Sequence, residues 1–357
     1  MLEDQAPIVR DVTSDEMQHW NDLVIQNPDG GSFLQTREFA QLKEKYWKSH
    51  RFIVETSYGK LAVQVLCRYV FPLGELWYFP KGPGVRSYGE FRKISQAFRL
   101  YIQANYPNVF LVQFEPEVTA DIQMNELERD GMKLAPSIQA STSTVIINLE
   151  DTSKTILAGF SKRARYYIRL GIKEKIVTRA VNATEDNFRQ MYELMATASN
   201  GRGVRGIRPY EYYRDHWYVF MKAGLGKLYF AYENDVPVVG AFITTLGAKA
   251  TYRDGGSDPR RTSKGASYLL QWHIMQELRV LGAKSYDMWG VLTRQGMNNT
   301  THPYYGVSLF KTAFNKEILE YCGTLDYPFS PVKYRLWRNL VYPLYYHMDR
   351  LQARHFY

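Results

Sequence analysis

Cysteine is scarce in this chain, which has only 2 among its 357 residues. Cys67 and Cys322 lie far apart, and two distant thiols form neither a disulfide framework nor a zinc site. Cys67 falls within an apolar stretch and is expected in a core strand. The 7 histidines do not follow the spacing of metal ligands. We therefore expect a reducing environment and neither a metal nor another bound cofactor.

Long apolar runs are absent as well, because Lys and Arg interrupt each of them. None approaches the roughly 18–20 residues of a membrane-spanning helix. Residues 1–5 are acidic and lack the positive start and apolar run of a signal peptide. The sequence also has no Walker loop, dinucleotide fingerprint or nucleophile elbow. These absences predict a cytoplasmic protein, with peripheral contact at the inner face of the membrane left open.

Positive charge and aromatic residues are abundant. The chain has 45 Lys and Arg against 36 Asp and Glu, a formal net charge of +9. That balance fits phosphate-bearing ligands, nucleic acid or an anionic membrane. The 28 tyrosines fit both a packed core and a binding site, so their number alone decides nothing. Because one core rarely serves more than about 250–300 residues, the length predicts two domains.

The predicted elements follow the same order in both halves of the chain. The first half gives helices at 13–26 and 36–45, a hairpin at 52–69, a strand at 75–79, a glycine-rich stop at 80–84, a helix at 91–102 and a strand at 109–114. The second half gives helices at 184–199 and 209–224, a hairpin at 227–245, a strand at 250–253, a stop at 254–257, a helix at 266–280 and a strand at 284–289. A repeat on this scale predicts a duplicated α/β unit.

Mixed sheets with helices after the strands are typical of the GNAT-like N-acyltransferase fold, so we predict two tandem GNAT-like domains. The predicted boundaries are 1–148 for the first domain, 149–318 for the second, and 319–357 for a C-terminal segment that packs back on the first. In such folds a turn before a helix presents backbone N–H groups to a cofactor phosphate. The best local match is 260–266, and an ordinary basic turn before a helix is an equal interpretation.

Six segments together resemble the FemABX family of aminoacyl-tRNA-dependent peptidyltransferases. They are 32–43, 79–83, 114–118, 208–212, 255–257 and 310–314, in the family's order. The chain is most similar to the family's short branch, which has no coiled-coil arm. The resemblance implies transfer of an amino acid from aminoacyl-tRNA onto the amine of a peptidoglycan stem peptide, carried by UDP-MurNAc-pentapeptide or lipid II.

The resemblance also implies that the domain at 1–148 binds the acceptor precursor, and it implies individual acceptor-binding residues. These are Lys43, Arg208, Tyr212, Tyr252, Asp254 and Ser257. Lys43 and Arg208 match the family's phosphate-binding positions, where Arg offers a planar fork of donors and Lys a point charge. Asp254 stands where the short branch carries a tyrosine, and Tyr252 is the candidate to replace it. This departure leaves the identity of the acceptor peptide open.

Catalysis is assigned by the same resemblance. The reaction is aminolysis of an ester, in which an oxyanion develops and is stabilised by a fixed cation or donor. Lys311 matches the family's lysine for this role, with Phe310 beside it. Glu115 is the candidate to orient or deprotonate the amine. Each has a structural alternative: Lys311 as a cation extending from an apolar face, and Glu115 as a carboxylate in a turn.

The donor would be recognised through RNA. Basic residues interleaved with Tyr166 and Tyr167 fill the stretch from Lys154 to Arg179, and the tRNA-binding candidates are Lys162, Arg163, Arg165 and Arg169. This mixture suits phosphate contacts and stacking on unpaired bases. The C-terminal stretch with Arg335 and Arg338 fits RNA, an anionic membrane or a solvated helix face equally.

Three functions from different classes therefore stay open at this stage. The first is the aminoacyl-tRNA-dependent transferase, the second an acyl-CoA-dependent N-acyltransferase on the same fold, and the third a non-catalytic RNA-binding protein. The transferred amino acid, the nucleotide- or lipid-linked nature of the acceptor, the number of residues added, the general base and the oligomeric state do not follow from the sequence.

Overall fold

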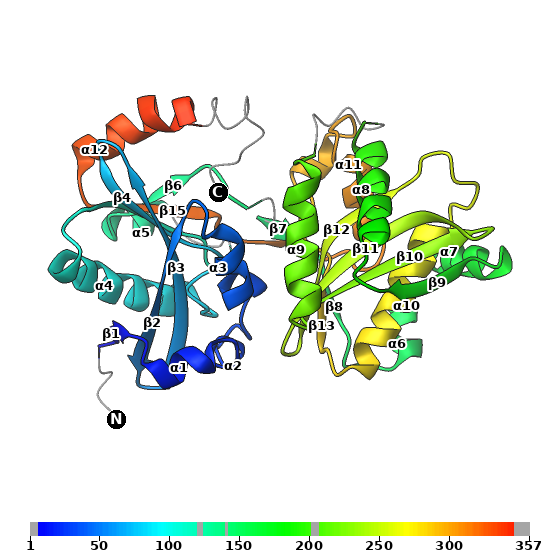
Figure 1. Cartoon of the computed structure of the whole chain (residues 1–357), viewed down its shortest axis with the longest axis horizontal. Coiled ribbons are helices and arrows are strands. Elements are labelled where there is room, and N and C mark those ends of the chain that lie inside the picture. Colours follow the sequence, from blue (N-terminus) through cyan, green and yellow to red (C-terminus); the bar gives the residue numbers. More distant parts are fainter. Residues whose placement is uncertain (1–5, 120–123, 140–141, 201–206, 346–357) are drawn as a thin grey trace. The chain divides into compact units, whose positions relative to one another are not determined.

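The computed structural model describes residues 6–119, 124–139, 142–200 and 207–345. The chain divides into two compact units. The first comprises the described parts of Met1–Thr142 and Tyr321–Tyr357, and the second is Ser143–Glu320. In Figure 1 the first unit thus joins the blue-to-teal beginning of the chain with its orange and red end.

A seven-stranded sheet is the centre of the first unit. In order across the sheet its strands are β1 (Ile8–Asp11), β2 (Lys48–Thr56), β3 (Gly59–Val70), β4 (Gly74–Phe79), β5 (Val109–Phe114), β15 (Thr324–Pro328) and β6 (Lys133–Ala135). The pair β4 and β5 is parallel, and the other neighbours are antiparallel. Every residue of β5 is buried, as expected for an inner strand covered on both faces.

Helix α4 (Tyr88–Asn105) connects the parallel strands and carries the core side chains of this unit. Phe91, Ile94, Phe98 and Ile102 recur at helical spacing, and all four are fully buried. The other helices are α1 (Ser14–Gln18), α2 (Trp20–Ile25), η1 (Phe33–Gln35), α3 (Arg37–Lys43), α5 (Met124–Arg129), α12 (Pro331–Leu336) and η3 (Trp337–Val341), the last a π-helix.

A capping box at residues 13–16 begins helix α1. The Thr13 side chain accepts the Glu16 backbone N–H, and the Glu16 carboxylate accepts the Thr13 N–H at 3.0 Å. The single helix expected after it is wrong, because the backbone of His19 leaves the helical region and separates α1 from α2.

A six-stranded sheet is the centre of the second unit. In order its strands are β8 (Ile146–Asn148), β13 (Ser285–Asp287), β12 (Lys249–Ser257), β11 (Val236–Leu246), β10 (Gly226–Glu233) and β9 (Val177–Val181). The helices are α6 (Ser153–Gly159), α7 (Lys162–Lys173), α8 (Glu185–Asn200), α9 (Tyr210–Lys222), α10 (Ala266–Val280), η2 (Gly296–Asn298) and α11 (Tyr305–Lys311). A short pair, β7 (Ser143–Thr144) and β14 (Leu319–Glu320), forms a separate ribbon.

The two sheets share one topology. In each, three consecutive antiparallel pairings are followed by one parallel pair, β4 with β5 and β12 with β13. A helix joins the parallel strands in both units, α4 in one and α10 in the other. A strand from a distant part of the chain then follows antiparallel, β15 or β8. The predicted fold, two tandem α/β units with mixed sheets, is confirmed by this shared topology.

The glycine-rich stop predicted at residues 254–257 is wrong. Strand β12 continues through these residues to Ser257 and pairs with β11 along the way. Gly256 is needed for close approach instead, because a Cβ there would lie 2.4 Å from the backbone nitrogen of Met195 in α8. The glycines let a helix lie directly on the strand.

Candidate functional site

Lys311 is a buried cation at the end of α11. Its side chain is mostly covered, with the residue 8% exposed, and its Nζ donates to the carbonyl oxygens of Trp289 at 3.2 Å and Gly290 at 3.0 Å. These carbonyls follow strand β13, and Trp289 adopts a positive φ of 57°. Nζ also lies 5.4 Å from the ring centre of Tyr252. The ammonium is therefore fixed in direction by groups of the second unit itself.

An aromatic column connects Phe310 with the basic helix α7. The Phe310 ring meets Tyr268 edge-on at 4.9 Å, and Tyr268 stacks on Tyr167 at 5.0 Å. The guanidinium of Arg163 lies 5.8 Å from the Tyr167 ring. Two predicted groups, the catalytic pair and the basic helix, are thus linked by packed rings.

The predicted acceptor residues of the second unit gather at the start of α9 and the end of β12. Arg208 precedes α9, and its guanidinium lies 4.2 Å from the ring centre of Tyr212. Burial disfavours the charge of Arg253, yet Asp254 and Tyr212 beside it raise the pKa of that guanidinium above its ordinary value. Tyr212 and Asp254 therefore share Arg253 as a neighbour.

Both carboxylate oxygens of Asp254 contact residues of the second unit. Trp217 Nε1 donates to one carboxylate oxygen at 3.0 Å, and the Arg253 guanidinium lies 3.1 Å from the other. The Arg253 guanidinium also lies 5.9 Å from the Trp289 ring, whose carbonyl holds Lys311. One continuous network therefore runs from the acceptor candidates to the lysine.

Tyr252 and Ser257 complete this end of the strand. The Tyr252 hydroxyl lies over Gly255, where a Cβ would be only 1.8 Å away. Gly255 therefore leaves room for the tyrosine, which reaches towards Lys311. Ser257 is the last residue of β12 and is half-buried opposite Val239 of β11.

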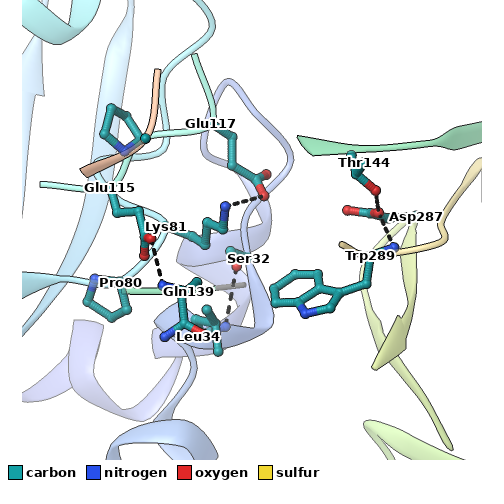
Figure 2. Close-up of polar contacts among 12 residues, drawn as sticks. Ser32, Leu34, Pro80, Lys81, Glu115, Glu117, Gln139, Thr144, Asp287 and Trp289 are labelled. Carbon is teal, nitrogen blue, oxygen red and sulfur yellow. Dashed lines mark hydrogen bonds and ion pairs between the residues drawn. The ribbon is translucent and has the colours of Figure 1, made fainter. Parts of the chain in front are cut away.

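Asp287, at the end of β13, braces the turn that holds the lysine. It accepts a hydrogen bond from the Thr144 hydroxyl and another from the Trp289 backbone N–H at 2.7 Å, as Figure 2 shows. The carbonyl of Trp289 is then presented to Lys311. The sequence reasoning missed this carboxylate, which follows a short strand and carries no motif of its own.

The first unit carries the other two predicted residues. Lys43 is the last residue of α3, and its Nζ lies 5.4 Å from the Phe39 ring. Glu115 follows β5 and is 2% exposed. Its carboxylate accepts a hydrogen bond from the Tyr78 hydroxyl at 2.6 Å. It also accepts one from the Gln139 backbone N–H at 2.9 Å, as Figure 2 shows. Both of its oxygens are therefore engaged within this unit.

Lys81 is the functional candidate that the sequence reasoning missed. It is 1% exposed, and its Nζ lies 4.0 Å from Glu117 Oε1 and 4.9 Å from the Tyr321 ring centre. Burial raises the pKa of Glu115, and the Lys81 cation partly offsets that rise. The only sequence feature that points to Lys81 is its position in segment 79–83, directly after a predicted strand.

Lys81 and Lys311 are the only buried lysines in the described part of the chain. Lys81 follows β4, and Lys311 bonds the carbonyls that follow β13. Each unit therefore places one enclosed cation where its parallel strand pair ends. In α/β sheets this is the edge at which ligands commonly bind.

The basic helix α7 presents most, though not all, of its predicted cations to solvent. Lys162, Arg163 and Arg169 are exposed. Arg165 instead donates to the carbonyl oxygens of Ala158 at 2.8 Å and Phe160 at 2.6 Å, at the end of α6. We therefore separate Arg165, which holds the neighbouring helix, from the three exposed cations.

The turn before α10 is filled by a carboxylate. Glu233 accepts the backbone N–H groups of Thr262 at 3.0 Å and Ser263 at 2.7 Å. At the helix start, a Cβ on Gly265 would lie 2.4 Å from the backbone nitrogen of Gly171 in α7. The part of 260–266 that resembles a phosphate-binding turn is thus occupied by groups of the chain itself.

Among residues 6–119, 124–139, 142–200 and 207–345, no cluster of His, Cys, Asp and Glu has the geometry to hold a metal ion. The helices in those ranges include none that is long and apolar enough to cross a membrane.

Comparison with known proteins gives a consistent picture. Residues 222–341 match the model of the FemAB family. A curated relative, aminoacyltransferase FemA of Staphylococcus epidermidis, is 24% identical over 107 residues, which is 30% of this chain and 25% of that protein. The aligned part therefore spans only a quarter of the curated relative.

Solved structures extend the likeness over most of the chain. The crystal structure of FemX superposes with a TM-score of 0.78 at 17% identity, covering 93% of this chain and 99% of that one. The structure of L-PGS from Bacillus licheniformis superposes with a TM-score of 0.50 at 12% identity, covering 93% and 98%. At these identities the likeness establishes the fold.

Proposed function

We propose that the chain is a member of the FemABX family and that it transfers an amino acid from aminoacyl-tRNA onto the amine of a peptidoglycan stem peptide, as the matching family model, the curated relative and the shared fold support. The acceptor is UDP-MurNAc-pentapeptide or lipid II, the latter reached by peripheral contact with the membrane. The observation that carries the proposal is Lys311, an enclosed cation held by two backbone carbonyls within the segment that matches the family model.

Aminolysis of the aminoacyl ester is accelerated by a cation near the reacting carbonyl. The acceptor amine attacks the ester carbonyl, a C–N bond forms, and the C–O bond to the terminal ribose breaks. The amine proton ends on the departing ribose oxygen, so no net proton is released by that exchange. Negative charge gathers on the carbonyl oxygen in between, and a preorganised donor in an enclosed site stabilises it. Lys311 is assigned this role, and the Phe310 ring helps to exclude water from it.

The acceptor needs cations for its diphosphate and donors for its peptide. Arg208 stands at the start of α9, where helix N–H groups also favour an anion. In the first unit, Lys43 offers a second cation. Tyr212 and Tyr252 offer hydroxyl groups beside Arg208 and Lys311, and Asp254 and Ser257 shape the end of β12. Glu115 is the candidate to orient the amine.

The donor is proposed to bind along α7. Lys162, Arg163 and Arg169 provide phosphate contacts, and the exposed ring of Tyr166 provides a stacking surface for an unpaired base. The aromatic column from Tyr167 to Phe310 connects this helix with Lys311.

An acyl-CoA-dependent N-acyltransferase on the same fold is the second candidate. It needs free N–H groups before α10 for the cofactor's pyrophosphate. Glu233 takes the N–H groups of Thr262 and Ser263, and α7 packs on Gly265. This arrangement weighs against the second candidate and in favour of the tRNA donor.

The deciding experiment is mass spectrometry of both acceptors after incubation with the protein and charged total tRNA. We expect a gain of one or more amino-acid residues, absent after ribonuclease treatment. Acyl transfer from an acyl-CoA, with no gain from tRNA, would support the second candidate.

Two lysine substitutions, Lys311→Ala and its control Lys284→Ala, distinguish a role in catalysis from a role in RNA binding. Lys311→Ala is expected to lower turnover by about 10²–10³-fold, the range for loss of an oxyanion donor, with RNA affinity unchanged. Lys284→Ala is the matched control, because its side chain is 66% exposed and paired only at the surface with Glu150. Equal turnover in both variants would remove Lys311 from the catalytic role. No turnover in the wild type, with RNA still bound, would leave a non-catalytic RNA-binding protein as the better account.

A further inference from the structure

The outer side of the C-terminal helix carries aliphatic residues where polar ones are usual. Residues 331–345 are helical throughout, as α12, η3 and the residues that follow. Val332, Leu336, Leu340 and Leu344 are 68%, 46%, 55% and 55% exposed. Residues four apart lie on the same side of a helix. They therefore form one continuous line, here called the aliphatic ridge.

The opposite side of this helix is firmly attached to the first sheet. Trp337 is fully buried, and its ring meets Phe110 of β5 at 6.0 Å. Arg338 forms an ion pair with Asp326 of β15, whose carboxylate is fully buried. The helix thus has a buried face of its own, and the aliphatic ridge is a second apolar face turned to solvent.

The turn between β3 and β4 extends the apolar surface. Phe71 is 77% exposed and Tyr69 is 62% exposed. This turn lies beside α12, because a Cβ on Gly74 would be 3.8 Å from Lys333 Nζ. Figure 1 shows the same neighbourhood, with the orange helix α12 next to the hairpin of β3 and β4. Both elements belong to the first unit.

The helix of the aliphatic ridge carries cations but no acidic residue. Residues 331–345 include Lys333 and Arg335 and no Asp or Glu, whereas Arg338 is paired with Asp326 on the buried side. Lys133 of β6 reaches the same helix, with its Nζ 5.1 Å from the Tyr334 ring. An apolar line flanked by cations is the pattern of helices that lie in the interface of an anionic bilayer.

We propose that the aliphatic ridge, together with Phe71 and the flanking cations, docks the protein on an anionic lipid surface. The four side chains of the ridge are aliphatic, and exposed aliphatic side chains enter the boundary of a bilayer. The cations next to the ridge meet the negative headgroups. The surface brings the first unit to the membrane that carries lipid-linked precursors, a consequence that rests on the proposed function.

The test is co-sedimentation of the full chain with vesicles of phosphatidylcholine alone or mixed with phosphatidylglycerol. We expect binding to the anionic vesicles that weakens as salt is raised, and little binding to the neutral ones. Leu336→Ser with Leu340→Ser should lower the partition coefficient at least tenfold. These side chains are half exposed, so the fold should be kept.

The matched control is Val280→Ser with Leu281→Ser at the end of α10. These residues are 87% and 63% exposed, so the change removes a similar exposed apolar surface from the second unit. It should leave vesicle binding unchanged. Equal binding of the ridge variant and the wild type would overturn the proposal, as would failure of the wild type to bind anionic vesicles.

Two further outcomes would give the aliphatic ridge a different binding partner. A loss of tRNA affinity in the ridge variant, with vesicle binding intact, would make it an RNA surface. A fall in molecular mass by sedimentation equilibrium would make it an interface between two copies of the chain. Vesicle binding needs no turnover, so a failure of the proposed transferase activity would leave this result standing. If both hold, the ridge variant should keep transfer to the nucleotide-linked acceptor and lose it to lipid II in vesicles.

Discussion

Lys81 lies beside the carboxylates of Glu115 and Glu117 at one end of the first sheet. Enclosing a charge is unfavourable unless an opposite charge accompanies it, and removing one partner of a buried pair costs about 3–5 kcal/mol. Glu115 shows the conflict directly, because burial raises its pKa while Lys81 lowers it. The lysine therefore decides how far Glu115 can stay ionised in the folded protein.

Lys81→Met should make stability more sensitive to pH. A carboxyl whose folded pKa lies above its unfolded value contributes stability that is full below the unfolded pKa and is lost as the pH rises through the folded one. Removing the cation raises the folded pKa of Glu115 further. We expect the free energy of unfolding to fall more steeply than in the wild type as the pH rises above the ordinary pKa of a glutamate, as measured by urea titration.

Two companion variants make this prediction specific. Lys60→Met removes an exposed lysine paired with Glu16 and should change stability by less than about 1 kcal/mol at any of these pH values. Adding Glu115→Gln to Lys81→Met should remove the additional pH slope, since the titrating group is gone. A slope that persists in the double variant would assign the effect to another group.

The candidate residues show what a sequence can and cannot reveal at this scale. The family resemblance singled out Lys311 and Tyr252, and the structure places the cation 5.4 Å from that ring. Lys81 was overlooked because a lysine in a loop between prolines and glycines ordinarily faces water. Its burial depends on Glu117 and Tyr321, which come from distant parts of the chain.

At the scale of elements, helix α8 packs directly against strand β12 because Gly256 has no side chain. A Cβ on Gly256 would lie 2.4 Å from the Met195 nitrogen and 2.5 Å from the Leu194 carbonyl carbon, both backbone atoms that cannot move alone. Gly256→Ala should therefore destabilise the protein by about 1–3 kcal/mol, the usual range for overpacking. Thermal and urea unfolding measure it.

Gly159→Ala is the control for this change. Gly159 lies in α6 with no atom within 4 Å of the added Cβ, so the substitution adds a methyl group without a clash. Alanine is favoured over glycine within a helix by about 0.5–1 kcal/mol. The control should therefore be neutral or slightly stabilising. Similar losses in both variants would indicate a general intolerance of change rather than close packing at β12.

Element boundaries followed from the sequence wherever local patterns determine them. The predicted helix 266–280 and strand 109–114 have the observed bounds of α10 and β5. Apolar periodicity and a Pro or Gly at each end suffice for such elements. The end of β12 was mispredicted because its glycines resemble a turn, and only the packing of α8 shows why they lie in a strand.

Helix α7 offers a test of the proposed RNA contacts. Arg163→Ala with Arg169→Ala removes two exposed cations, and we expect weaker tRNA binding with a smaller dependence on salt, by about one unit of slope for each lost phosphate contact. Filter binding across a range of salt concentrations gives both quantities. Stability should be nearly unchanged, because both side chains are exposed.

Arg165→Ala should behave in the opposite way. Its guanidinium donates hydrogen bonds to two carbonyl oxygens at the end of α6. Removing it leaves these carbonyls without that donor, which lowers the free energy of unfolding by about 1–3 kcal/mol. We expect lower resistance to urea with little change in the salt slope. If Arg165→Ala instead weakened RNA binding most, the division of the helix into exposed and structural cations would be wrong.

At the scale of the whole chain, the first unit is assembled from both ends of the sequence. Strand β15 lies between β5 and β6 and pairs with each. It also brings Asp326, whose carboxylate accepts the buried Gln113 amide at 2.8 Å. The second unit, in contrast, is one continuous segment, Ser143–Glu320. The two units should therefore respond differently to removal of the C-terminus.

A chain ending at Glu320 should lose the first unit and keep the second. Without β15, strand β5 becomes an edge strand and Trp337 no longer covers Phe110. The buried Gln113 amide also loses its hydrogen bond to Asp326. Hydrogen exchange read by mass spectrometry should show lost protection in β4 and β5 and retained protection in β10 to β12. A chain ending at Tyr345, which keeps every described element, is the matched control. Protection of β5 in the shorter chain would mean that the first sheet folds without its C-terminal strand, and that β15 joins a unit already formed.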